Sequence, residues 1–141
     1  MLKSEVFEMN PKVAIAPVVL TDNTAAVSTI IDMQGYEALT FVIATGTLAD
    51  ADATFAVTVD HGNDSGLSDA ASVPTDQLAG TLANASFTFA ADNSTRKIGY
   101  IGYKRYVRLT VTPSANTSSA PISAVAILSE AVNQPTAAVP V

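Results

Sequence analysis

The chain of 141 residues contains no cysteine and no tryptophan. Without cysteine it can form no disulfide, no thiolate metal site and no cysteine nucleophile. Charged residues make up only 14% of the sequence, whereas about 25% is typical of globular domains. A surface so poor in charge is either covered by partners or built from serine, threonine and alanine. Because the chain can form no disulfide and no thiolate metal site, its fold must be stabilised by packing alone.

Long apolar runs are missing as well. No stretch approaches the ~20 apolar residues that a helix needs to span a bilayer. The start of the chain alternates charged and apolar side chains, which is unlike a secretory signal. We therefore expect no membrane partner and a protein that is made in a cytoplasm.

The apolar residues that are present follow the spacing of β-strands. Residues 54–60 place Phe55, Val57 and Val59 on one face of a strand, and residues 105–112 alternate in the same way. The second strand therefore points its tyrosine and arginine side chains away from the core. The other predicted strands are rich in β-branched or aromatic residues and cover residues 13–20, 26–31, 39–45, 85–90, 97–101 and 122–128.

About eight short strands separated by turn residues favour an all-β fold, an antiparallel β-sandwich of the jelly-roll type. By its length the chain is a single domain covering residues 1–141. Within it we expect an N-terminal arm (1–11), the sandwich (12–130) and an extended, uncharged C-terminal tail (131–141). A short helical turn is expected within residues 68–82.

The strongest functional signal is a basic and aromatic segment. Residues 96–108 hold five of the seven lysines and arginines and three of the four tyrosines of a chain whose net charge is −6. Tyrosine and arginine are favoured at protein interfaces because they bring large contact areas. The predicted partner-interface residues are Arg96, Lys97, Tyr100, Tyr103, Lys104, Arg105, Tyr106 and Arg108.

Two other interpretations of this segment remain open. Its cations can belong to a solvated edge strand, where they prevent aggregation. Its arginines and aromatic rings can also stack nucleic-acid bases. A pI of about 4.4 opposes the second interpretation, and we expect no nucleic-acid partner.

Catalytic and metal-binding patterns are weak. His61, the only histidine, follows Asp60 and precedes Ser65, but members of a Ser-His-Asp triad usually converge from separate elements. Asp64 and Asp69 in the same loop offer oxygen ligands for calcium, although their spacing does not match an EF-hand. A polar turn explains these residues as well. We expect no enzyme, no cofactor and no metal site.

Residues 60–63 and 93–109, with the sandwich pattern around them, resemble the cement or head-decoration proteins of tailed bacteriophages. The resemblance covers about residues 38–130 and is one of general pattern. It implies a jelly-roll protomer on the outer surface of an icosahedral capsid, where it clamps neighbouring major capsid subunits against the pressure of packaged DNA. It also implies self-association, as dimers or, in other decoration families, as trimers.

Two rival functions stay open at this stage. One is another structural component of a phage head or tail. The other is a carbohydrate-binding β-sandwich that uses Tyr100, Tyr103 and Tyr106 as stacking platforms, although the absence of tryptophan weakens it.

Overall fold

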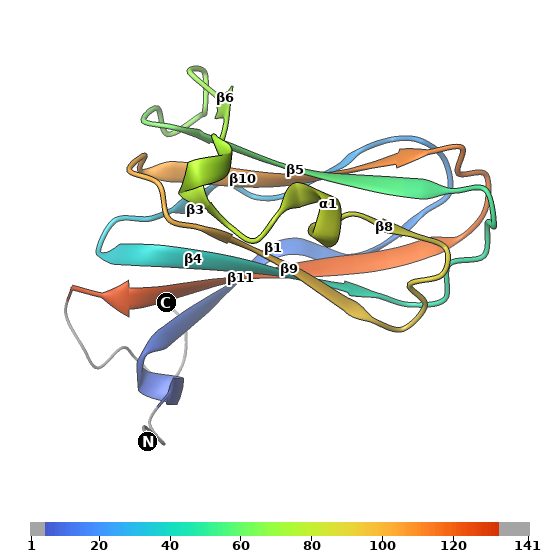
Figure 1. Ribbon diagram of the computed structural model, residues 1–141, viewed down its shortest axis with the longest axis horizontal. Helices are drawn as coiled ribbons and strands as arrows, with labels where there is room; N and C mark the ends of the chain where they lie inside the picture. The colour runs from blue at the N-terminus through green and yellow to red at the C-terminus, as the bar shows by residue number, and fades with distance from the viewer. Residues whose placement is uncertain (1–4, 133–141) are drawn as a thin grey trace.

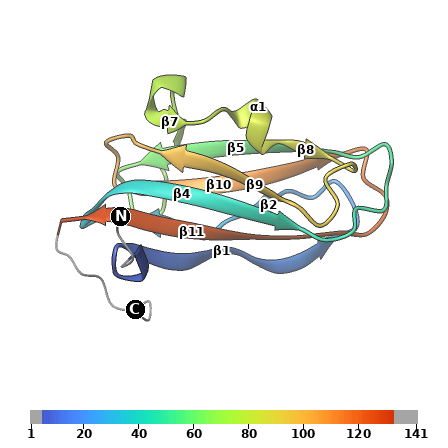
Figure 2. The same cartoon turned by 60° about the horizontal axis from the view of Figure 1, so that its bottom comes forward.

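The computed structural model describes residues 5–132, which form two antiparallel sheets facing each other (Figures 1 and 2). The strands of sheet A lie in the order β1 (Met9–Leu20), β11 (Ala120–Ala131), β4 (Tyr36–Thr45), β9 (Thr95–Tyr100) and β7 (Leu78–Ala79). Sheet B consists of β2 (Ala26–Val27), β3 (Ile31–Asp32), β10 (Tyr106–Ser114), β5 (Thr54–Gly62), β6 (Ala71–Ser72) and β8 (Phe87–Thr88). No helix among residues 5–132 is long and apolar enough to cross a membrane.

The connections are those of a jelly roll. The chain alternates between the sheets, from β1 in sheet A to β2 and β3 in sheet B, then to β4 and β5, and later from β9 to β10 to β11. The short strands β2 and β3 share one side of β10, and β6 and β8 share one side of β5. The predicted antiparallel sandwich of jelly-roll type is therefore confirmed.

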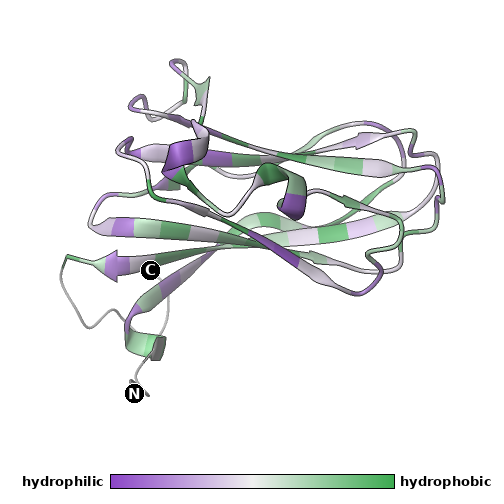
Figure 3. Cartoon of the chain, viewed as in Figure 1, coloured by the Kyte–Doolittle hydropathy of each residue, from purple (hydrophilic) through white to green (hydrophobic). Residues whose placement is uncertain are grey.

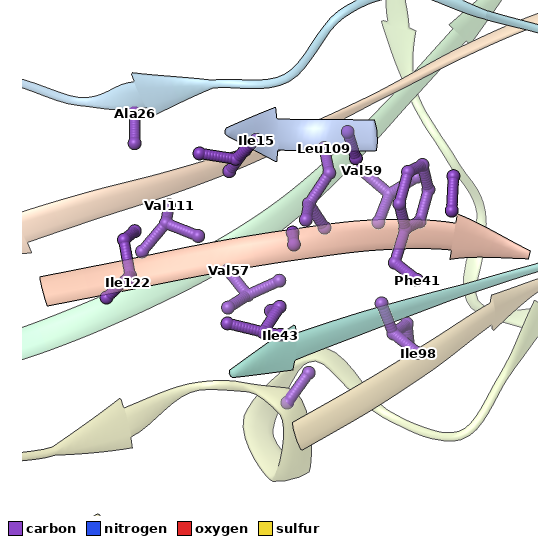
Figure 4. Packing of buried hydrophobic residues seen from close by; sticks show 14 of the residues in the cluster. Ile15, Ala26, Phe41, Ile43, Val57, Val59, Ile98, Leu109, Val111 and Ile122 are labelled. Atoms are coloured by element: carbon purple, nitrogen blue, oxygen red, sulfur yellow. The ribbon is translucent and has the colours of Figure 1, made fainter. Parts of the chain in front are cut away.

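The core fills the space between the two sheets (Figure 4). Phe41 and Ile43 point inward from β4, and Val57, Val59 and Leu109 meet them from sheet B, each at most 2% exposed. This alternation is the predicted one for residues 54–60 and 105–112. Burial of these aliphatic and aromatic side chains supplies the main stabilising free energy of a chain without disulfides.

Among residues 5–132, three short helices accompany the sheets: η1 (Glu5–Phe7), η2 (Thr75–Gln77) and α1 (Leu82–Ala85). The helical turn expected within residues 68–82 is η2. The strand expected over residues 85–90 is wrong at both ends, since only β8 (Phe87–Thr88) is strand and residues 89–90 form a turn. At its start, Ala85 ends helix α1, which Thr81 caps by accepting a hydrogen bond from the amide of Asn84. Helix α1 contacts both β5 and β9 and covers the gap between the sheets on one side (Figure 1).

The expected boundaries of the two terminal segments also change. Strand β1 begins at Met9, which pairs with Ser129, so the sheet includes residues that we assigned to the arm. Pro11 is accommodated because β1 is an edge strand. Strand β11 ends at Ala131, the first residue of the expected tail, and the amide of Val132 donates to the carbonyl of Gly35 at 2.9 Å. The rest of the expected tail, residues 133–141, lies outside the described residues.

From the packing of the core we predict how truncating one of its side chains changes the free energy of unfolding. Replacing the fully buried Leu109 by alanine should lower the free energy of unfolding by about 2–5 kcal/mol, since it leaves a cavity between the sheets. The control is Thr112→Ala, on the same strand but exposed. Urea denaturation measures both, and equal midpoints for the two variants would contradict the assigned core.

Candidate interaction surfaces

The basic segment predicted from the sequence is not one strand. Residues 96–100 belong to β9 in sheet A, residues 106–108 belong to β10 in sheet B, and residues 101–105 form the loop that joins them. Gly102 permits this crossing, because a Cβ at its position would lie 2.5 Å from the hydroxyl oxygen of Tyr100. The eight predicted interface residues are therefore distributed over two sheets and one end of the sandwich.

Tyr100 is fully buried, so its assignment to a partner interface is wrong, as is its assignment to a sugar platform. Its hydroxyl oxygen accepts a hydrogen bond from the amide of Lys104 at 3.0 Å and lies 2.8 Å from Nδ1 of His61. Which atom donates in this contact depends on the tautomer of the imidazole, because the hydroxyl can donate its proton or accept a second hydrogen bond. This contact links β9 of sheet A to β5 of sheet B and fixes the loop between β9 and β10.

His61 itself is buried at the end of β5, and its ring packs edge-on against Tyr100 with centroids 5.6 Å apart. Burial, helped by the charge of Lys104, lowers the pKa of His61, and burial raises the pKa of Tyr100. Both effects favour the neutral form of the imidazole over the charged one. Its hydrogen bond to Tyr100 gives it a structural role in joining the sheets.

Arg105 has a carboxylate partner within the same chain. Its guanidinium forms a two-point contact with Asp32, with both distances 2.9 Å, and donates a further hydrogen bond to Gln34 at 2.7 Å. It also lies 5.0 Å from the centroid of the Tyr106 ring. The hydrogen bonding between Arg105 and Asp32 lowers the pKa of the Asp32 carboxyl group and raises the pKa of the Arg105 guanidinium. This arrangement fastens the loop to β3.

Two more predicted interface cations also have contacts inside the chain. Arg108 lies directly opposite Asp60 in the neighbouring strand, 3.8 Å from its carboxylate. Arg96 donates a hydrogen bond to the carbonyl of Asn84 at 3.3 Å. Lys97, Tyr103 and Lys104 differ from them, since their side chains are exposed and make no hydrogen bond or ion pair within the part of the chain that the structure describes.

The loop of residues 101–105 is the one place where predicted interface residues gather in an accessible position. It lies at the end of the sandwich that also holds β6 and the end of β11 (Figure 1). Tyr103 is 93% exposed and Ile101 is 49% exposed. Beside them is an open hollow of ≈ 630 Å³, whose lining includes Gln34, Tyr36, Glu37 and Glu130.

Backbone hydrogen bonds hold this loop in place. The amide of Ile101 donates to the carbonyl of Gln77 at 2.9 Å, and the amide of Met33 donates to the carbonyl of Arg105 at 2.7 Å. The amide of Arg105 donates to Oδ1 of Asn63 at 3.3 Å. The two exposed apolar side chains therefore project from a loop with a fixed conformation.

The acidic loop after His61 is organised by its own backbone. Asp69 accepts hydrogen bonds from the amides of Asn63 and Asp64, and Asp64 accepts from those of Gly66 and Ser68. These bonds lower the pKa of both carboxyl groups. Across residues 5–132, no cluster of three or more acidic or histidine side chains is placed to hold a metal ion. The polar-turn interpretation accounts for all of these contacts.

A further surface, outer face A, was not found from the sequence. It is the solvent side of sheet A, where outward-pointing residues of neighbouring strands form rows such as Val13, Val125, Val42 and Lys97. The residues of outer face A are Met9, Pro11, Val13 and Val19 of β1, Pro121, Ser123, Val125, Ile127 and Ser129 of β11, Ala38, Thr40, Val42 and Ala44 of β4, and Thr95 and Lys97 of β9. Lys97 is the one charged side chain in this set.

The solvent side of sheet B has a different composition. Its residues are mainly threonines and charged side chains: Thr54, Thr58 and Asp60 of β5, Arg108, Thr110 and Thr112 of β10, and Asp32 of β3. Ala56, Tyr106 and Val27 also lie on this side of the sheet. In Figure 3 most hydrophilic residues lie at the loops and strand ends, with further hydrophilic bands within β1, β9 and β10. The two outer faces are therefore chemically unlike each other.

Comparisons with known proteins identify the fold. No protein-family model matches the chain, and neither does any curated protein. Solved structures do match. The chain superimposes on the CBM22-1–GH10 modules of Clostridium thermocellum endo-1,4-β-D-xylanase 10B, solved with xylohexaose, with a TM-score of 0.53 and 10% identity, over 91% of this chain and 27% of that one.

Two further matches are viral or prophage-derived. A chain of the infectious bursal disease virus, Gx strain, matches with a TM-score of 0.50 and 12% identity, over 90% of this chain and 33% of that one. The protein YomS of the SPBc2 prophage matches with a TM-score of 0.48 and 10% identity, over 85% of this chain and 93% of that one. The present chain thus spans about a quarter of the xylanase chain and a third of the virus chain. The likeness shows the fold alone.

The contact between Tyr100 and His61 predicts a specific loss of stability. Tyr100→Phe removes the hydroxyl and leaves Nδ1 of His61 and the amide of Lys104 without their partner, which should cost about 1–3 kcal/mol. The Lys104 amide should also exchange its hydrogen faster. Tyr103→Phe is the matched control, because that ring is exposed. Unchanged stability and exchange in Tyr100→Phe would contradict the assigned hydrogen bonds.

The lowered pKa of His61 predicts how stability depends on pH. In the unfolded chain His61 takes up a proton near pH 6.5, whereas the folded chain does so only at lower pH. The free energy of unfolding should therefore fall as the pH drops from 7.5 to 5.5. The variant His61→Gln should lose this dependence, since the chain has no other histidine. Urea denaturation at both pH values tests it, and an equal slope in the variant would refute the assignment.

Proposed function

We propose that this chain is a cement protein of a virion, which binds the outside of an icosahedral capsid and clamps neighbouring major capsid subunits. The sequence resemblance to phage cement proteins suggests this role. The observation that supports it best is the fixed loop of residues 101–105, which presents Tyr103 and Ile101 to solvent at one end of the sandwich. This function is non-enzymatic and needs no cofactor.

A rigid loop with an exposed tyrosine suits binding to a protein surface. Tyr103 offers a large contact area with few rotatable bonds, and its loop is already ordered by the amide contacts of Ile101, Lys104 and Arg105. Binding therefore loses little conformational entropy. Lys104 next to it supplies a positive charge that can pair with a carboxylate of the capsid partner.

The predicted interface is narrower than the sequence suggested. Arg105 and Arg108 already face Asp32 and Asp60, so a partner would have to compete with these contacts. We therefore assign the capsid contact to Ile101, Tyr103 and Lys104. The contribution of Tyr103 should not depend on salt, whereas that of Lys104 should weaken as salt screens its charge.

One rival function has an observation in its favour. Tyr103 borders the ≈ 630 Å³ hollow together with Gln34 and Asn63, and a ring beside polar groups is also suited to binding a sugar. The fold is shared with a virus chain and with xylanase modules, so it does not decide between the two functions. The other rival, a different phage head or tail component, would differ in copy number, because a cement protein repeats over the whole shell.

The test uses purified particles of the virus that encodes the chain, stripped of it and incubated with recombinant variants. Tyr103→Ala should weaken attachment by about 2 kcal/mol, roughly thirty-fold, at all salt concentrations. Lys104→Ser should weaken it mainly at low salt. Phe89→Ala is the matched control, because Phe89 is an exposed aromatic residue outside the loop.

Occupancy is counted by gel densitometry against the major capsid protein. Wild-type occupancy in Tyr103→Ala would refute the assigned contact, and absence of the chain from particles would refute the proposed function. Affinity electrophoresis in gels containing xylan or other soluble polysaccharides examines the sugar-binding alternative. Retardation that is lost in Tyr103→Ala would favour that alternative over the cement function.

A further inference from the structure

Outer face A has the composition of a buried surface. An antiparallel sheet with one side in solvent usually alternates apolar residues inward and polar residues outward. Outer face A instead places valine, isoleucine, alanine and proline outward on β1, β11 and β4, with Val13 60%, Val19 54% and Val125 39% exposed. Its charge is confined to Lys97 on β9, although the chain as a whole is acidic.

The apolar character of outer face A continues into a shallow hollow of ≈ 320 Å³ at one end of the face. The lining of this hollow includes Val18 and Val19 of β1, Ala44 of β4 and Pro121 of β11. Extended apolar surfaces of this kind on a globular protein mark interaction sites. Sheet B shows that the fold itself does not require such a surface, because its solvent side is built mainly from threonines and charged side chains, with Val27 as its exposed valine.

We infer that outer face A packs against the same face of a second copy of this chain. Interfaces that form and dissociate are about as polar as the rest of the protein surface, whereas homodimer interfaces are more apolar and poor in charge. With one charged residue, Lys97, and many apolar ones, outer face A resembles a homodimer interface. A second copy is also the partner that is always present when the chain folds, so it can cover this face before any other protein is met.

The size of outer face A fits this occupant. Four strands about 4.8 Å apart, each with roughly nine residues rising about 3.3 Å, cover on the order of 600 Å² before side-chain relief is counted. A standard stable interface buries about 800 Å² on each partner. Two such faces would together bury on the order of 1,200 Å², which is the lower end of the range for specific interfaces. The face is therefore just large enough for a dimer.

The edge of sheet A is less suited to association than its face. Strand β1 forms that edge, and it contains Pro11 and Pro17, which have no amide hydrogen to donate. Its pairing with β11 is also interrupted between Val13 and Ile15 and between Ile15 and Val18. Such features block the addition of a further strand. Packing of face on face, as in two stacked sheets, remains available.

The position of Lys97 favours one arrangement of the two copies. A two-fold axis parallel to the strands and passing between β11 and β4 places β9 of each copy over β1 of the other. Lys97 then lies over the row of Val13 and not over its own counterpart, so like charges are kept apart. In this arrangement both loops of residues 101–105 are at the same end of the dimer.

The experiment measures the mass of the full chain in solution and links it to outer face A. Sedimentation velocity at increasing concentration should give a dimer, twice the chain mass of 14.5 kDa. Val125→Asp, at the centre of the face, should give a monomer. Thr58→Asp, at the centre of the outer side of sheet B, is the control and should remain a dimer.

Cross-linking tests the same contact without a disruptive charge. Because the chain has no cysteine, Val125→Cys introduces a single thiol, and a short bis-maleimide should link two copies through it. Thr58→Cys should stay unlinked. If Val125→Asp fails to melt cooperatively, its monomeric state would not be informative, and the cross-link through Val125→Cys then tests whether outer face A forms the dimer.

Several outcomes would overturn the inference: a monomeric wild type, a dimeric Val125→Asp, or no cross-link through Val125→Cys. A monomeric wild type whose attachment to particles is lost in Val125→Asp would assign outer face A to the capsid and not to a second copy. The inference does not depend on the proposed function, since the mass in solution is measured without particles. A dimer that fails to attach would refute the cement function alone.

Discussion

The side chains packed between the two sheets are the interaction on which the rest of this protein depends. Phe41 and Ile43 from sheet A and Val57 and Leu109 from sheet B are almost completely buried against one another. With no cysteine in the chain, no disulfide or thiolate metal site can replace this packing. It also fixes which residues of every strand point outward, because successive side chains of a strand alternate between its two sides. The surfaces available to partners are therefore set by the core.

One polar contact adds to this packing where the chain passes from β9 to β10. The hydroxyl of Tyr100 joins His61 in sheet B to the amide of Lys104, and Gly102 leaves room for it. Buried hydrogen bonds of this kind are costly to break, because each group left without a partner has lost its contact with water. The contact thus holds the loop of residues 101–105 and keeps Tyr103 exposed at the end of the sandwich.

The two surfaces proposed for binding differ in chemistry and in position. Outer face A is broad and almost uncharged, whereas the loop of residues 101–105 is a small projection with an aromatic ring and a positive charge. Self-association through the face would present two loops on one particle-facing end, and two weak contacts made together bind far more strongly than either alone. In the proposed function, two such loops would let the dimer attach firmly to a repeating shell.

The sequence by itself determined the fold class, because period-two alternation in residues 54–60 and 105–112 specifies strands with one buried side. It also located the segment that contains Tyr103 and Lys104. It did not reveal that Tyr100 is buried, that Arg105 pairs with Asp32, or that residues 96–108 divide between two sheets. These facts depend on contacts between residues up to 73 positions apart in the chain. Outer face A likewise exists only after β1, β11, β4 and β9 lie side by side, since each strand contributes a few apolar residues that become one surface through the order and register of the sheet.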